Sequence, residues 1–123
     1  MDAKTFWSIV ELRSRAALRE RFEAMTAEEL GDFYWTAKDH ALEFMDEQYS
    51  DQMETPSEDE QYDIANWIVL HGKAFYEDHL AHPEKFPDSV PLDPDEDWDL
   101  LTLSNEVYEE RFDGDVYDHE PAD

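Results

Sequence analysis

The acidic segment near residue 95 carries the residue types that bind calcium in proteins. The acids at positions 1, 3, 5 and 12 of a calcium loop are Asp95, Asp97, Asp99 and Glu106. Calcium takes carboxylate oxygens from such positions, but the sharp turn at position 6 requires glycine, and that residue is Leu100. Acids at the start of a helix also stabilise its dipole without any ion. We therefore expect these carboxylates to cap a helix and to face solvent, with calcium binding as the alternative.

Two histidines form a second candidate metal site. His79 and His82 could share one helix face, where Glu77 or Asp78 could join them as ligands. A histidine before Pro83 also suits the negative end of a helix dipole. Because no third well-spaced ligand stands out, we predict no metal and no cofactor.

The sequence contains no pattern that indicates a particular reaction. Pairs of neighbouring acids such as Glu28–Glu29 and Glu109–Glu110 are expected by chance in a chain with 34 Asp and Glu. Acid–base catalysis would need two carboxyl groups in differently polarised surroundings. No Ser–His–Asp pattern, P-loop or dinucleotide loop occurs, and only three glycines are present. We predict that the protein is not an enzyme, and keep a metal-dependent enzyme as an alternative.

The distribution of charge is the most informative feature of the chain. The formal net charge is -25 on 123 residues. Residues 1–45 hold 9 acids and 6 bases, whereas residues 46–123 hold 25 acids and 3 bases. A field of this sign repels nucleic acid and anionic membranes and attracts basic proteins. We therefore expect a basic protein partner, with no direct contact to nucleic acid or to a membrane.

The composition is that of a folded domain. The apolar share is 41% and the aromatic share is 14%, which is too high for a solvated acidic tail. The length fits a single core. The chain has no cysteine, begins without the pattern of a signal peptide and has no run of membrane-spanning length. We expect a cytoplasmic protein, and the sequence does not indicate its oligomeric state.

Apolar spacings of three and four residues predict an all-α protein, a small single-domain bundle of about four to five helices. The predicted helices span residues 6–24, 26–47, 57–72 with an extension to residue 81, and 97–112. Capping boxes at Thr26 and Ser57 mark two of the starts, and residues 48–57 form a polar loop.

The predicted domain covers residues 1–112 and contains a stiff connector. Four of the six prolines lie between residues 83 and 94, and we assign residues 83–96 to this connector. Residues 113–123 are predicted to form a frayed acidic tail.

The arginines of the first predicted helix have two interpretations. Arg13, Arg15, Arg19 and Arg21 all lie off its apolar stripe. They either neutralise the acidic second half within the fold, which we favour, or form a separate basic patch.

Several short motifs occur in the order found in a known bacterial family. The motifs are Phe6-Trp7-Ser8-Ile9-Val10-Glu11, Ser57-Glu58-Asp59-Glu60-Gln61-Tyr62, Trp67-Ile68-Val69-Leu70-His71-Gly72-Lys73, Tyr76-Glu77, His82-Pro83-Glu84 and Val107-Tyr108-Glu109-Glu110. With them the chain resembles the bacterial domain-of-unknown-function family 4240 over roughly residues 6–112. The resemblance implies an α-helical bacterial domain and brings no established activity or catalytic residue.

These observations favour an interaction protein of the inhibitor or immunity type. Such a protein would cover the basic, nucleic-acid-binding surface of a partner such as a nuclease toxin, or act as a DNA mimic. The expected contact residues are Asp46, Glu47, Asp51, Glu54, Glu58, Asp59, Glu60, Asp93, Asp95, Glu96, Asp97 and Asp99, with Trp98 as the apolar anchor. The alternatives are a regulatory or adaptor domain that uses an apolar groove, and a calcium-binding or metal-dependent protein. Acidity for solubility or in a salt-rich environment remains open too.

Self-repulsion among the acids leads to a first prediction. The melting temperature should rise between low salt and about 0.5 M salt, because screening weakens the repulsion that opposes compaction. Thermal unfolding followed by circular dichroism measures this shift. An unchanged melting temperature would contradict the prediction.

Overall fold

The computed structural model describes residues 1–89 and 98–116, and within these ranges the protein is all-α, as predicted. The elements in chain order are α1 (Ala3–Val10), α2 (Arg15–Glu23), α3 (Ala27–Leu42), α4 (Glu47–Ser50), α5 (Glu58–Leu70), α6 (Lys73–Ala81), the 3-10 helix η1 (Pro83–Lys85) and α7 (Leu100–Arg111). The described helices outnumber the four to five predicted because the first predicted helix is divided in two and a short helix, α4, forms at the start of the predicted loop 48–57.

The first predicted helix, over residues 6–24, is instead two helices. Arg13 adopts a left-handed backbone conformation with φ of 57°, and the Ser14 side chain accepts a hydrogen bond from the Ala17 N–H to begin α2. The Glu11 carboxylate accepts a hydrogen bond from the Lys73 N–H at 3.2 Å, so the turn docks on the start of α6. The apolar spacing did not predict the break between α1 and α2, because apolar residues continue at the same spacing on both helices.

The second predicted helix, over residues 26–47, ends earlier. α3 begins at the predicted capping box, where Thr26 and Glu29 bond reciprocally, but it stops at Leu42. The Gln61 carboxamide donates hydrogen bonds to the carbonyls of Phe44 at 2.8 Å and Asp46 at 3.2 Å. These bonds hold the chain in a turn, and α4 then occupies the first residues of the predicted loop 48–57.

The third predicted helix and its extension are confirmed. Ser57 caps α5 by accepting a hydrogen bond from the Glu60 N–H at 3.1 Å. Gly72 separates α5 from α6 with φ of 98°, a conformation that favours glycine.

The last helix begins three residues later than predicted, because Asp99 and Thr102 form a reciprocal capping box. The predicted connector 83–96 begins with η1, and residues 90–97 lie outside the described residues. Residues 113–116 were predicted to be frayed, and the structure differs. Val116 is fully buried, and its N–H donates a hydrogen bond to the Asn105 side chain. Residues 117–123 also lie outside the described part.

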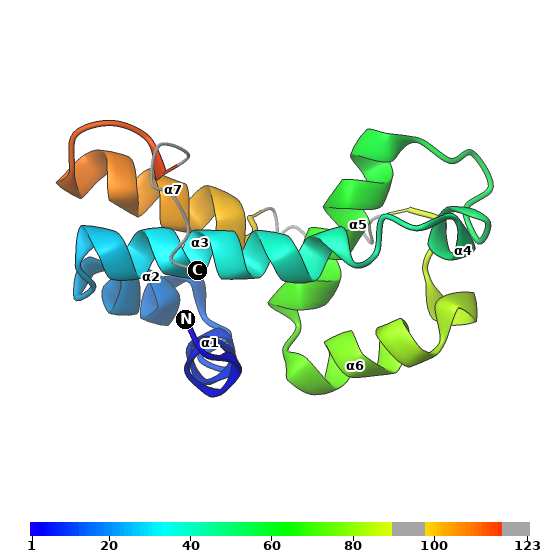
Figure 1. The fold of residues 1–123 in the computed structure, drawn as a ribbon, viewed down its shortest axis with the longest axis horizontal. Helices are drawn as coiled ribbons and strands as arrows, with labels where there is room; N and C mark the ends of the chain where they lie inside the picture. Colours follow the sequence, from blue (N-terminus) through cyan, green and yellow to red (C-terminus); the bar gives the residue numbers. More distant parts are fainter. Residues whose placement is uncertain (90–97, 117–123) are drawn as a thin grey trace.

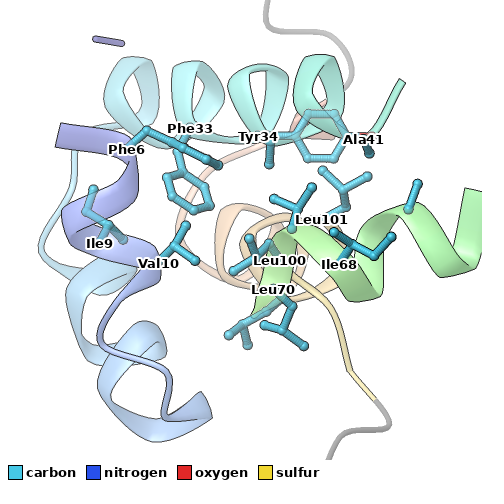
Figure 2. Close-up of a cluster of buried hydrophobic side chains, with 14 of the residues drawn as sticks. Phe6, Ile9, Val10, Phe33, Tyr34, Ala41, Ile68, Leu70, Leu100 and Leu101 are labelled. Carbon is cyan, nitrogen blue, oxygen red and sulfur yellow. The ribbon is translucent and has the colours of Figure 1, made fainter. Parts of the chain in front are cut away.

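α3 is the central element of the fold. It runs from the end of the molecule that holds α2 and α7 to α5, and it packs most extensively against α7 and α5 (Figure 1). Phe6 and Phe33 meet on one side of α3, while Tyr34 and Leu101 meet further along it (Figure 2). The chain therefore builds one continuous core, in which α3 joins the α1–α2–α7 end to the α4–α5–α6 end.

The turn at Gly72 yields a stability prediction. A Cβ atom at this position would lie 2.6 Å from Glu11 Oε1 and 2.7 Å from Arg13 Nη2. Gly72→Ala should lower the free energy of unfolding by about 1–3 kcal/mol through backbone strain and this clash. Urea unfolding measures the loss, with Gly114→Ala, at φ of 92° on the exposed end of the fold, as the comparison. Equal losses in both variants would show that the contact with Glu11 adds nothing.

Candidate functional site

Two of the four arginines considered in the sequence, Arg15 and Arg19 of α2, bind acids of the second half of the chain, as favoured. The Arg15 guanidinium lies 3.2 Å from the Glu106 carboxylate, and Arg19 lies 3.4 Å from the same group. Arg19 also pairs with Glu110, and its hydrogen bond to Glu110 raises the pKa of the guanidinium. α2 and α7 can therefore pack side by side although α7 is acidic on this face.

Three further bases form ion pairs near their own position in the chain. Arg13 pairs with Glu11, Lys73 with Glu77, and Lys85 with Asp78. Arg111 instead donates to the carbonyls of Phe22 and Met25.

The acids predicted at 46–60 receive none of these cations. Six of them are exposed, namely Asp46, Glu47, Asp51, Glu54, Glu58 and Asp59, whereas Glu60 is half-buried. In the described part of the chain none of the seven carboxylates makes an ion pair, and residues 46–60 contain no Lys or Arg. The α4 end of the molecule thus carries a surface of uncompensated negative charge, which we call the α4 acidic surface.

The second predicted group of acids is only partly described. Asp93, Asp95, Glu96 and Asp97 lie outside the described residues. Trp98, the expected apolar anchor, is half-buried and packs against the core. It lines a cavity of about 690 Å³ together with Arg15, Glu106 and Glu109. This cavity lies on the side of the α2–α7 ion pairs.

Three predicted acids line a different pair of cavities between α3, α5 and the start of α7. The larger holds about 340 Å³ and is lined by Asp99 together with Tyr34, Lys38, Tyr62, Asp63 and Asn66. The smaller holds about 270 Å³ and is lined by Glu58 and Asp59 together with Lys38, Leu42, Met45 and Tyr62. The two cavities adjoin because Lys38 and Tyr62 line both. We call the combined depression the α3–α5 groove.

Carboxylates crowd this groove. Burial, followed by the charges of Asp99, Asp59 and Glu60, raises the pKa of the Asp63 carboxyl above its usual value. The nearest cation is Lys38, whose ammonium lies 5.0 Å from the centre of the Trp35 ring. The groove is therefore a place where negative charge is concentrated.

Sequence reasoning did not identify the residues that build the groove walls. Tyr34, Lys38 and Leu42 recur every fourth residue of α3, and Tyr62 and Asn66 are four apart on α5. Such spacing places each set on one helix face. That signal was available, but it does not reveal that the two faces meet.

The two candidate metal patterns resolve into other contacts. Asp99 caps α7 and Glu106 pairs with two arginines, while Asp95 and Asp97 lie outside the described residues. His79 is buried against the Phe75 carbonyl at 2.9 Å, and His82 pairs with Glu84 at 3.2 Å. Across residues 1–89 and 98–116, no three His, Asp or Glu side chains are grouped so as to hold a metal.

Within the same ranges, no helix has the length and apolar character needed to cross a membrane. No family model, curated protein or solved structure matches the chain. The resemblance to family 4240 therefore stays a prediction. The α4 acidic surface and the α3–α5 groove are the features that bear on function.

The crowding at Asp63 yields a pH prediction. Because the folded state raises its pKa, the ionised carboxylate destabilises the fold at neutral pH. Asp63→Asn should therefore raise the midpoint of urea unfolding at pH 7. This gain should vanish below about pH 3.8, the ordinary pKa of aspartate, where both states are protonated. Asp113→Asn on the exposed C-terminal side is the control, and a pH-independent gain would contradict the electrostatic explanation.

Proposed function

We propose that the protein is an acidic binding module that covers a basic surface of a partner protein, as an inhibitor or immunity protein does. The observation that carries this proposal is the segregation of charge. Arg15 and Arg19 of α2 form ion pairs with α7, while the seven acids of residues 46–60 remain without a cation in the described chain.

Uncompensated charge of one sign has a cost, because like charges repel within the fold. A basic partner surface relieves that repulsion and gains complementary contacts. Complementary charge also steers encounter, raising association rates towards about 10⁸–10⁹ M⁻¹s⁻¹ at low salt. Rapid capture is useful against a target such as a nuclease, whose substrate is itself a polyanion. Such a protein would contact the nuclease or another nucleic-acid-binding protein in place of the nucleic acid.

A second candidate is an adaptor domain that recognises its partner through an apolar groove. Leu42 is 47% exposed, although it is a large apolar residue, and lies in the α3–α5 groove with Met45 and Tyr62. Exposed apolar side chains in a depression are typical of contact sites. Glu58 and Asp59 flank the same groove. The acidic module and the adaptor domain therefore differ in whether charge or apolar contact dominates partner binding.

Charge reversal distinguishes these candidates. The test variant carries Glu47→Lys, Asp51→Lys and Glu54→Lys. The matched control carries Glu20→Lys, Asp39→Lys and Asp113→Lys, which are also exposed and change the net charge equally. Each form is immobilised at about 50 mM salt, where surface electrostatics is strong, exposed to lysate of the native host and eluted with a salt gradient.

We expect one basic protein to be retained by the native chain and by the control but lost from the test variant. With that protein purified, its affinity for the test variant should fall by more than tenfold. Circular dichroism verifies that both variants are folded. Retention that survives the α4 reversals would overturn the acidic-surface proposal and favour the apolar-groove adaptor.

A further inference from the structure

The larger cavity of the α3–α5 groove contains a buried polar group with no partner. Asn66 is only 7% exposed, yet its carboxamide makes no hydrogen bond within the described residues. Among the described residues, every side-chain nitrogen or oxygen that is fully shielded from solvent has a hydrogen-bond partner. The Asn66 carboxamide is therefore not fully shielded, and it stays accessible to solvent through the cavity that it lines. Buried amides are normally hydrogen-bonded to protein or to water, so this carboxamide has hydrogen-bonding capacity left for a group that enters the cavity.

The groups around Asn66 favour a cation. Asp63 and Asp99 line the same cavity, and Glu58 and Asp59 line the adjoining one, against the single ammonium of Lys38. Burial and then carboxylate crowding raise the pKa of Asp63, and a bound cation would offset the crowding. The Asn66 carboxamide oxygen can accept a hydrogen bond from the same cation.

The shape of the site favours a planar cation. The Tyr62 ring is half-buried and lines both cavities. A guanidinium stacks on aromatic rings and donates two parallel hydrogen bonds to a carboxylate, which an ammonium cannot do. The volume of about 340 Å³ lies near the lower limit of small-ligand pockets and suits one long side chain.

We infer that the cavity lined by Asp63, Asn66, Asp99 and Tyr62 receives an arginine side chain of the partner protein. The inference rests on the proposed function and specifies its anchor. The guanidinium lies against Tyr62 and donates to Asp63, Asp99 and the Asn66 carboxamide oxygen. The α4 acidic surface attracts the partner, and this arginine fixes its position.

The first test needs no partner. N-acetyl-arginine amide is titrated into the ¹⁵N-labelled protein at about 150 mM salt, which screens diffuse attraction. N-acetyl-citrulline amide, an uncharged near-isostere, is the matched probe. We expect saturable shifts of the Asn66 side-chain NH₂ signals with arginine and none with citrulline. Unmoved Asn66 signals, equal effects of the two probes, or tighter occupation of the site by spermidine would overturn the inference.

Variants then test the two charged walls. Asp63→Asn with Asp99→Asn should weaken arginine binding by about tenfold or more, since charge-assisted hydrogen bonds are lost. Asparagine preserves the helix cap at position 99. The control, Asp88→Asn with Asp113→Asn, changes the net charge equally at exposed positions. Lys38→Gln should strengthen binding by removing the competing cation, and weaker binding in this variant would instead indicate an anionic ligand.

The captured partner separates this inference from the proposed function. Asp63→Asn with Asp99→Asn should weaken partner binding relative to its control. If that variant binds normally while the α4 reversals abolish capture, the proposed function stands and the arginine site is wrong. If no partner depends on the α4 acids, the proposed function fails, and the arginine titration still decides whether the cavity recognises a guanidinium.

Discussion

The burial of α3 between two groups of helices is the constraint on which the rest of the structure depends. Near its start the Phe33 ring lies 4.8 Å from Phe22 of α2 and 5.1 Å from Phe6 of α1, while its later turns face α5 (Figure 1). α1, α5 and α7 pack directly on α3, and the remaining described helices take their places against these three and against one another. α7 also packs beside α2, and this contact brings Glu106 and Glu110 next to Arg15 and Arg19.

The small number of cations then decides where negative charge remains. Nine Lys and Arg cannot compensate 34 acids, and packing assigns Arg15 and Arg19 to Glu106 and Glu110. Exposed pairs of this kind contribute little individually. Their larger effect is on the pattern of potential, because the α2–α7 end is locally balanced while the α4 end is not. A uniform acidic coat for solubility would not require such a division.

The α3–α5 groove results from both the packing around α3 and the small number of cations. Helix packing leaves a depression between α3, α5 and the cap of α7, and the same packing brings carboxylates from separate elements towards it. Leu42 and Met45 line the smaller cavity together with Glu58 and Asp59, so the groove combines apolar and acidic side chains. The acidic-module and apolar-groove interpretations of the sequence therefore describe neighbouring parts of one face.

Local signals in the sequence determined the helical class, the caps at Thr26 and Ser57, the break at Gly72 and the exposure of most acids at 46–60, because each depends on neighbours a few residues apart. The breaks after Val10 and Leu42 were decided by contacts with distant residues, Lys73 and Gln61, that no local pattern contains. The α3–α5 groove likewise depends on contacts between residues that are far apart in the sequence. Asn66 has an ordinary sequence context, and only the packing of α3 and α7 around α5 buries it without a partner, because burial is a property of the assembled fold and not of a segment.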